Sequence, residues 1–184
     1  MTKASSTVKT DFVLPIAVLT IICLVCSGLL GFINGMTAPV IADTEAKIAA
    51  EARTEVLPEA DGFTKLEWDS VKPEGSFVTE AYKADNGSGY VFMITGDGYG
   101  GRGTMKLIVG MDADGAVVRT KTLQHAETAG MGSKTADEAY RSQWTGKTGA
   151  TIDQVDAISG ATFSSTYYKD SMRSAFEAFA QVAK

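Results

Sequence analysis

The sequence predicts an α+β protein, in which a single N-terminal transmembrane helix is followed by a small antiparallel-sheet domain flanked by helices. An uncharged apolar run near the N-terminus predicts the transmembrane helix. Runs rich in β-branched and aromatic residues predict the sheet, and apolar residues at helical spacing near the C-terminus predict a covering helix. The expected parts are an N-terminal segment of residues 1–11, a transmembrane helix of 12–33, a connecting helix of 34–58 and a domain of 59–184.

Composition limits the partners and sites that the chain can have. Its 184 residues suffice for one domain of about 150 residues plus an anchor. The net charge is −5 without any basic run, so we expect no nucleic-acid binding, which needs a basic face. Both cysteines, Cys23 and Cys26, lie in the apolar run, so the rest of the chain has no disulfide or cysteine-ligated metal site. We interpret the pair as small residues facing lipid or a partner helix rather than as a redox pair.

The apolar run at residues 12–33 is long enough to cross a bilayer, which takes about 20 helical residues. Pro15 falls in the first turn of the expected helix, where its missing N–H costs little. A cleaved signal peptide is the alternative, but its apolar core would be shorter, about 7 to 15 residues. We therefore expect an uncleaved, single-pass anchor.

Basic residues are distributed unequally around the apolar run. Lys3 and Lys9 precede it, whereas Lys47, the first basic residue after it, lies among acidic residues. Because basic residues favour the cytoplasmic side of a membrane, we expect a cytoplasmic N-terminus and a domain outside. The run itself has no ionisable side chain, so ion transport linked to this protein would have to pass through other subunits.

Strands are expected in the middle of the domain, over residues 77–82, 89–95, 104–111 and 116–123. An Asp-Gly turn joins the last two as a β-hairpin. The run from Gly96 to Gly101 matches the pattern GxGxxG, but a dinucleotide site would need a helix immediately after it. The next residues, RGTMKLIVG, have strand composition instead. We therefore interpret the run as a glycine-rich connection within the sheet.

Helices are expected on both sides of these strands. Apolar spacing predicts a helix that leaves the membrane and ends at Leu57-Pro58. A second helix is expected over residues 133–144, because Thr135 and Glu138 have the spacing of a capping box. A final helix is expected from about Ser164, with one apolar stripe formed by Tyr168, Met172, Ala175, Phe176, Phe179 and Val182.

The loop expected after the hairpin, His125 to Gly132, contains the one histidine of the chain. A single histidine cannot form a histidine-rich metal site, and no serine has a convincing triad around it. We therefore expect neither a metal site nor a catalytic residue. The glycines on either side of Met131 would let the backbone approach a flat ligand, with an apolar side chain for stacking. A plain polar loop remains the alternative.

Residues 155–165 combine an apolar pair, a tight turn and several hydroxyl groups before the final helix. We expect a short strand over 155–158 and a turn that contains Gly160. Thr162 would then lie within about two residues of a helix start, where unpaired N–H groups and the helix dipole favour a phosphate. The alternative is that Thr162 or Ser164 only caps the helix.

The segment Asp156-Ala157-Ile158-Ser159-Gly160-Ala161-Thr162 resembles the acceptor motif of the FMN-binding domain family, D-x-x-[ST]-G-A-T, at every specified position. The loop at 125–132 is similar to a second family pattern, with Ala129 and Met131 in place of the usual Pro and Leu. The resemblance covers nearly the whole chain, with an FMN-binding domain over residues 59–184. It is closer to the G subunit of Rnf-type electron transport complexes than to the longer C subunit of the sodium-pumping NADH:quinone reductase.

The resemblance implies that a flavin transferase links FMN covalently to the Thr162 hydroxyl by a phosphoester bond. It implies that Ser159, Gly160 and Ala161 line the phosphate and that Asp156 serves recognition by the transferase. It also implies that the isoalloxazine ring lies against Glu127, Thr128, Met131 and Gly132, with Lys147 as a weaker candidate for the flavin site.

By the same resemblance, the chain would be an electron-transfer subunit rather than a complete enzyme. It would relay electrons through FMN in a complex that couples electron flow between ferredoxin and NAD to ion movement. Its place would be the cell (inner) membrane of a bacterium or archaeon, with the domain on the periplasmic or extracellular side and other membrane subunits as partners. The alternatives are a C-like subunit of a sodium-pumping NADH:quinone reductase, a stand-alone extracytoplasmic flavoprotein and an anchored binding domain without cofactor.

Overall fold

The computed structural model describes residues 4–183 and divides the chain into two units, which meet between Lys47 and Ile48. Helix α1 is continuous from Ala4 to Val56 and belongs to both units. The transmembrane and connecting helices expected separately thus form a single helix. Lys3, on which the expected orientation partly rests, lies outside the described residues.

Helix α1 ends at Val56, as expected from the Leu57-Pro58 pair, but it begins well before the apolar run. Pro15 therefore lies inside the helix and not in its first turn, as does Pro39. Each proline removes one backbone hydrogen bond, which a helix of this length can lose because the turns on either side remain bonded. Within residues 4–183, the segment Val13–Val56 is the one helical stretch that is long and apolar enough to cross a membrane.

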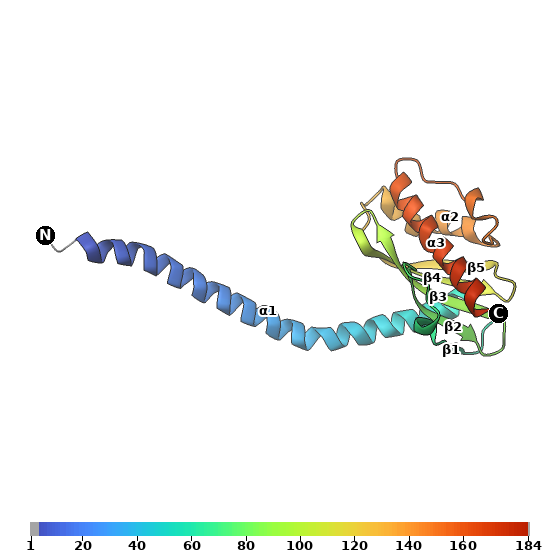
Figure 1. Ribbon diagram of the computed structural model, residues 1–184, viewed down its shortest axis with the longest axis horizontal. Coiled ribbons are helices and arrows are strands. Elements are labelled where there is room, and N and C mark those ends of the chain that lie inside the picture. Colours follow the sequence, from blue (N-terminus) through green and yellow to red (C-terminus); the bar gives the residue numbers. More distant parts are fainter. Residues whose placement is uncertain (1–3, 184) are drawn as a thin grey trace. The chain divides into compact units, whose positions relative to one another are not determined.

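The sheet is a five-stranded antiparallel meander whose spatial order follows the chain (Figure 1). Its strands are β1 (Phe63–Lys65), β2 (Val78–Ala84), β3 (Gly89–Gly98), β4 (Gly101–Asp112) and β5 (Val117–His125). The four expected strands are confirmed, and β1 is an additional edge strand that the sequence pattern did not predict. At three residues, β1 is too short to show an alternating pattern.

The glycine-rich run forms the tip of the β3–β4 hairpin. Gly98 pairs with Gly101 across a two-residue connection, and β4 follows at once. No helix follows the glycines at this place, so the interpretation as a connection within the sheet is confirmed. The Asp-Gly turn between β4 and β5 is also confirmed as a hairpin.

The two faces of the sheet are covered by different helices. Helix α3 (Thr162–Val182) packs on one face, where Phe92, Ile94 and Leu107 contribute to the larger core. The last turns of α1 pack on the other face through a smaller group, consisting of Ala52, Val56, Leu57, Ala84, Val91 and Ile108. Alternate residues of the strands point to opposite faces, so each helix receives its own apolar surface.

Gly110 of β4 lies directly against the end of α1. A Cβ atom there would overlap the backbone carbonyl of Val56. The absence of a side chain therefore lets the helix end approach the sheet closely, in the same way that glycine permits close backbone contact elsewhere.

The prediction of one continuous helix over residues 133–144 is wrong. The chain instead forms the 3₁₀ turn η2 (Gly132–Ala136), the short helix α2 (Glu138–Arg141) and the 3₁₀ turn η3 (Ser142–Trp144). The Thr135 hydroxyl donates to the carbonyl of Gly132 at 2.7 Å, so it does not cap a helix at Glu138. Asp137 has extended backbone angles, which break the helical path.

Aromatic packing explains why these turns replace a regular helix. The rings of Tyr140 and Trp144 both contact the ring of Tyr168, at centroid distances of 5.4 and 5.7 Å. All three side chains are buried. Burying such large rings releases more free energy than the few tenths of a kcal/mol per residue that separate helix propensities, so tertiary packing sets the local path.

The segment before α3 also differs from expectation. The strand expected over residues 155–158 is absent, and the chain forms the 3₁₀ turn η4 (Ile152–Gln154) followed by a loop. Val155 is buried and Ile158 packs against the core, so both apolar residues are used without a strand partner. The remaining short element, η1 (Trp68–Ser70), places the Trp68 ring in the same core.

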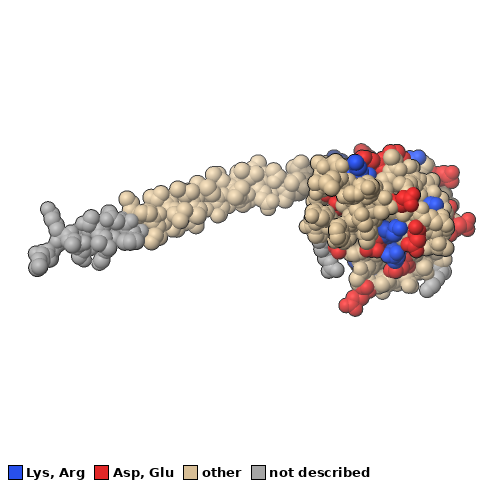
Figure 2. Space-filling model, turned by 90° about the horizontal axis from the view of Figure 1, so that it is seen from above, with Lys and Arg blue, Asp and Glu red and all other residues tan. Residues whose placement is uncertain are grey.

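The surface of the folded domain has charges of both signs. Figure 2 shows Lys and Arg interspersed with Asp and Glu on its visible face, whereas the apolar part of α1 is uncharged. Ion pairs such as Lys65–Glu80 and Lys121–Glu55 are partly exposed, so each stabilises the fold only slightly.

Candidate flavin site

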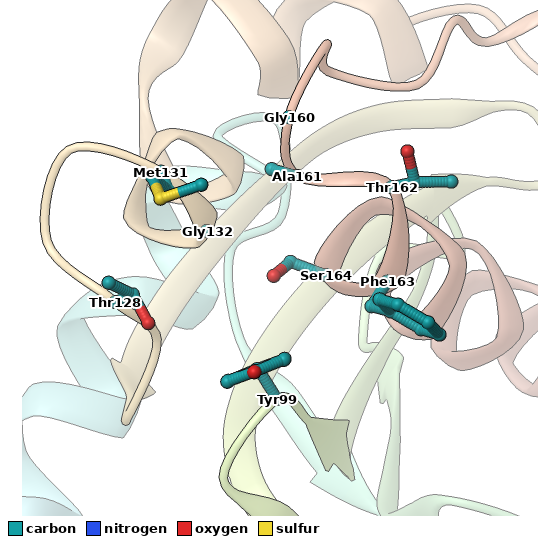
Figure 3. A pocket seen from close by; sticks show the side chains of 9 residues that line it. All are labelled: Tyr99, Thr128, Met131, Gly132, Gly160, Ala161, Thr162, Phe163 and Ser164. Carbon is teal, nitrogen blue, oxygen red and sulfur yellow. The ribbon is translucent and has the colours of Figure 1, made fainter.

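A pocket of about 430 Å³ opens where three separate segments of the chain meet (Figure 3). The segments are the tip of the β3–β4 hairpin, the loop after β5 and the start of α3. The volume lies in the range of sites that bind small molecules or cofactors. The pocket is lined by Tyr99, Thr128, Met131, Gly132, Gly160, Ala161, Thr162, Phe163 and Ser164.

Thr162 is the first residue of α3, and its side chain is exposed at the pocket. The N-cap position is held by Ala161, and no side chain caps this helix end. The alternative that Thr162 or Ser164 serves as a cap is therefore wrong. The first N–H groups of a helix have no partner within the helix and carry a partial positive charge, which together favour a phosphate group.

The turn before α3 has a conformation that depends on Gly160. The N–H of Ala161 donates to the carbonyl of Ile158 at 2.9 Å, and Gly160 has a φ of +79°. A positive φ at the third position is typical of a type II turn and favours glycine strongly. The Ser165 hydroxyl accepts the N–H of Ile158 and donates to the carbonyl of Ala161, both at 3.0 Å. A buried side chain thus holds the turn against the helix.

Glu127 lies behind the pocket, where it is only 8% exposed. Its Oε1 accepts the N–H of Tyr99 at 2.8 Å, and its Oε2 accepts the hydroxyl of Ser164. Gly132 packs on the same group, since a Cβ atom there would overlap the Glu127 carboxylate and Ser164 Oγ. Gly132 is therefore a glycine because the carboxylate occupies the space that a side chain would need.

Large apolar side chains around the pocket are exposed to solvent. Tyr99 is 66%, Met131 52% and Phe163 68% exposed. Figure 3 shows Met131 on the loop opposite the start of α3, with Tyr99 at the hairpin tip. Such a group of exposed apolar side chains on a polar domain indicates a binding surface. Aromatic rings and a methionine are suited to stacking on a flat ring.

Six of the residues implied by the family resemblance lie together in the pocket walls. They are Thr128, Met131, Gly132, Gly160, Ala161 and Thr162. Glu127 contacts the back of the wall rather than lining it.

The other three implied residues lie away from the pocket lining. Ser159 is exposed in the turn, and Asp156 is exposed with its N–H donating to the Gln143 side chain at 3.3 Å. The Lys147 ammonium donates to Gln154 Oε1 at 3.1 Å. The structure therefore does not bring Lys147 to the phosphate end of the pocket.

Three lining residues, Tyr99, Phe163 and Ser164, were not expected at the site from the sequence. The sequence could have indicated Phe163, because it lies off the buried stripe of α3. An aromatic residue on the solvated face of a helix does not serve the core and therefore suggests a binding role. The sequence indicated Tyr99 more weakly, as an aromatic residue at the tip of a glycine-rich hairpin. The contact of Ser164 with Glu127 joins residues 37 positions apart and had no local signal.

FMN fits this arrangement on two counts. The phosphate end would meet the uncapped start of α3, and the ring would meet the exposed apolar side chains. Both ends belong to one pocket, and the lining offers mostly apolar contacts with a few hydroxyl groups, as cofactor sites do.

Comparison with known proteins agrees with this geometry. Residues 98–177 match the FMN-binding domain, and this range contains every residue that lines the pocket. The G subunit of an ion-translocating oxidoreductase complex from Methanosarcina acetivorans is 29% identical over 171 residues, covering 88% of this chain and 91% of that protein. The G subunit of a proton-translocating ferredoxin:NAD(+) oxidoreductase complex from Clostridium ljungdahlii is 25% identical, over 86% of both chains.

A third relative is the G subunit of a Na(+)-translocating ferredoxin:NAD(+) oxidoreductase complex from Acetobacterium woodii. It is 27% identical over 190 residues, covering 91% of each chain. These similarities extend beyond the FMN-binding domain into the N-terminal part of the chain, since they cover most of its length. Residues 98–177 are thus similar to an FMN-binding domain, and most of the chain is similar to the G subunits of ion-translocating oxidoreductase complexes.

Proposed function

We propose that this protein is a membrane-anchored electron-transfer subunit of an ion-translocating complex of the ferredoxin:NAD oxidoreductase type, and that it carries FMN covalently on Thr162. One observation carries the proposal. The exposed hydroxyl of Thr162 stands at the uncapped start of α3, on a pocket that lies wholly within the FMN-binding match.

Attachment is a single group transfer to the threonine side chain. Thr162 Oγ1 attacks the FMN phosphorus of FAD, so that an O–P bond forms while the phosphoanhydride bond breaks and AMP leaves. The hydroxyl proton passes to a base of the flavin transferase. The exposed position of Thr162 supports this step, because the transferase has to reach the hydroxyl. Asp156, exposed six residues earlier, is available for recognition by the transferase.

After attachment, the chain's own residues bind and orient the cofactor. The N–H groups at the start of α3 hold the phosphoester, and Gly160 with Ala161 lets it approach the backbone. Tyr99, Met131 and Phe163, which line the pocket with exposed apolar side chains, would contact the ring and exclude water from it. When bound, FMN would supply the redox chemistry. No side chain is required as an acid, base or nucleophile in electron transfer.

The anchor and the names of the relatives support a place in a membrane complex. Helix α1 contains an apolar stretch without ionisable residues, so ion movement belongs to other subunits. The relatives from Clostridium ljungdahlii and Acetobacterium woodii are named as subunits of ferredoxin:NAD(+) oxidoreductase complexes, and we propose equivalent membrane partners for this chain. The lysines before the apolar run support a domain outside the cytoplasm. A covalent link suits that side, where lost FMN could not readily be replaced.

The attachment is tested by expressing the full chain with a flavin transferase and viewing a denaturing gel under ultraviolet light. We expect a fluorescent band that is absent in Thr162→Val and present in Thr166→Val. Thr166 is a matched control because it is exposed one turn further along the same helix. Fluorescence that persists in Thr162→Val would overturn the assignment.

The place in a complex is tested separately by affinity purification of the chain from membranes of its native host. Co-purification of multi-span and iron–sulfur subunits is the expected result. A chain that retains covalent flavin but purifies alone would contradict the complex and indicate a stand-alone flavoprotein.

A further inference from the structure

The walls of the pocket come from three segments that are distant in the sequence. Tyr99 comes from the β3–β4 hairpin, Thr128 to Gly132 from the loop after β5, and Gly160 to Ser164 from the start of α3. Short loops connected only at their ends are mobile unless side chains tie them together. The shape of the pocket therefore depends on contacts between these segments.

The carboxylate of Glu127 joins all three segments. Glu127 itself belongs to the loop, its Oε1 accepts the backbone N–H of Tyr99 at 2.8 Å, and its Oε2 accepts the hydroxyl of Ser164. Gly132 packs against the carboxylate from the pocket side. One side chain thus holds the hairpin tip and the helix start on either side of the loop.

The burial of Glu127 makes these contacts strong. The side chain is almost fully removed from solvent, and a carboxylate in such a place is stable only when its oxygens accept hydrogen bonds. Hydrogen bonds to a charged group are about twice as strong as those between neutral groups. Loss of the carboxylate would therefore release both neighbouring segments.

We infer that Glu127 is the positioning residue of the flavin site, rather than a residue that contacts the ring. Its carboxylate fixes the three walls of the pocket and places a negative charge just behind Gly132 and Ser164, both of which line it. The inference rests on the proposed function only for the identity of the ligand, because the contacts between the three walls are present in the protein alone.

The negative charge of Glu127 should also affect the reduction potential of the flavin. A buried negative charge beside the site opposes the gain of electrons there, because the medium between them screens poorly. Glu127 therefore lowers the reduction potential of the attached flavin. Removing the charge while keeping the shape should raise that potential.

Glutamine at position 127 separates the two effects. Its amide oxygen can accept the N–H of Tyr99, while its amide NH₂ donates to Ser164 Oγ, which accepts as readily as it donates. Glu127→Gln thus keeps both links and removes the charge. Glu127→Ala removes both links and the charge, and Ser164→Ala removes one link.

The first experiment measures amide hydrogen exchange at Tyr99 in the full chain, in detergent, without flavin. We expect Glu127→Ala to speed the exchange of this amide by about tenfold or more, since a hydrogen bond to a charged group is lost. Glu127→Gln should restore most of the protection. Glu177→Gln, which changes an exposed residue of α3, should leave the exchange as in the wild type. Unchanged exchange in Glu127→Ala would overturn the positioning role.

The second experiment titrates the flavin of the loaded protein spectroscopically to obtain its midpoint potential. We expect a shift to more positive potential in Glu127→Gln and none in Glu177→Gln. A potential in Glu127→Gln equal to that of the wild type would overturn the electrostatic role. If the wild-type chain takes up no flavin at all, the proposed function fails, while the exchange experiment still decides the role of Glu127.

Discussion

The hydroxyl of Ser165 accepts the backbone N–H of Ile158 at 3.0 Å and donates to the carbonyl of Ala161 at the same distance. Through these two bonds, the first helical turn of α3 holds the tight turn at residues 158–161 in place. Thr162 lies directly after that tight turn. The position of the acceptor hydroxyl follows from this relationship, because the turn that leads into Thr162 is bonded at Ile158 and at Ala161 to one buried side chain.

Replacing Ser165 by alanine should loosen this turn. The variant loses two hydrogen bonds and leaves the partly buried N–H of Ile158 without its Ser165 partner, so we expect a loss of about 1–3 kcal/mol in unfolding free energy. Flavin attachment should slow, because Thr162 is no longer held in place. Denaturant unfolding and a time course of in-gel flavin fluorescence measure the two effects. Ser142→Ala, at an exposed serine of η3, serves as control and should change neither.

Gly160→Ala tests the turn by a different route. The residue has a φ of +79°, a conformation that costs an alanine about 1 kcal/mol more than a glycine. Gly75 has a φ of +82° with open space around it and lies outside the pocket, so Gly75→Ala is a matched control. We expect a similar loss of stability in both variants but slower flavin attachment only in Gly160→Ala. Equal attachment rates would show that the shape of the turn does not matter to the transferase.

The exposed rings of Tyr99 and Phe163 should shield the attached flavin from solvent. Because both side chains are mostly exposed in the protein alone, Tyr99→Ala and Phe163→Ala should change the unfolding free energy by less than about 0.5 kcal/mol. Quenching of flavin fluorescence by iodide should nevertheless increase in each variant. Val71→Ala, at another exposed apolar residue, should leave the quenching as it is. Unaltered quenching in both ring variants would place the flavin ring elsewhere.

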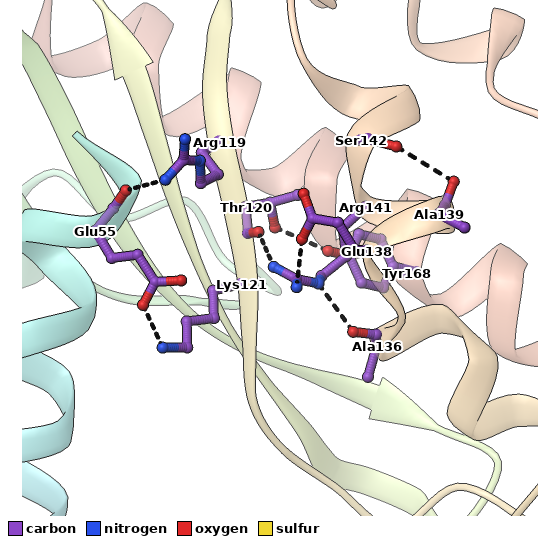
Figure 4. A network of polar contacts seen from close by, with 10 residues as sticks. All are labelled: Glu55, Arg119, Thr120, Lys121, Ala136, Glu138, Ala139, Arg141, Ser142 and Tyr168. Carbon is purple, nitrogen blue, oxygen red and sulfur yellow. Dashed lines mark hydrogen bonds and ion pairs between the residues drawn. The ribbon is translucent and has the colours of Figure 1, made fainter. Parts of the chain in front are cut away.

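A buried hydrogen bond of 2.8 Å between the hydroxyls of Thr120 and Tyr168 ties β5 to α3 (Figure 4). Tyr168→Phe leaves Thr120 Oγ1 with one partner fewer, and Thr120→Val does the same to Tyr168. We expect each variant to lose about 1–2 kcal/mol of unfolding free energy. The double variant should lose less than the sum, because the second change removes a group that the first already left unpaired. Strictly additive losses in the double-mutant cycle would contradict the coupling.

The buried tyrosines should also make the fold sensitive to alkali. Burial raises the pKa of Tyr140 to about 12, and burial likewise raises the pKa of Tyr168 above its ordinary value. A folded-state pKa above the unfolded value means that the neutral form is favoured in the fold. The corresponding stability is present below about pH 10 and is lost as the pH rises toward 12. Tyrosinate absorbance and circular dichroism, followed together, should show these tyrosines ionising only as the domain unfolds.

Tyr140→Phe is the control for this titration. Removing one tyrosine whose pKa is raised should make the fall in unfolding free energy between about pH 10 and pH 12 less steep. A pH profile identical to that of the wild type would mean that Tyr140 ionises freely in the folded protein.

The polar network around Arg141 shows why the region between β5 and α3 could not be predicted in detail. Its guanidinium donates to the carbonyls of Ala136 and Thr120 and to the Glu138 carboxylate. These bonds join α2 to β5 across 21 positions of sequence. The capping-box spacing at Thr135 predicts a regular helix on local grounds alone, and such local signals fail where distant groups compete for the same backbone.

The sequence by itself determined the features whose physical cause is local. The apolar run of α1, the alternation along β3 and the Asp-Gly turn need only neighbouring residues to be recognised. The position of Thr162 at a helix start, after a turn that contains Gly160, also follows from a few adjacent residues. Only the tertiary structure decided which segments meet around Thr162. Glu127, Tyr99 and Ser164 become one site because a buried carboxylate requires hydrogen-bond donors, and the packing of the sheet against α3 supplies them from distant parts of the chain.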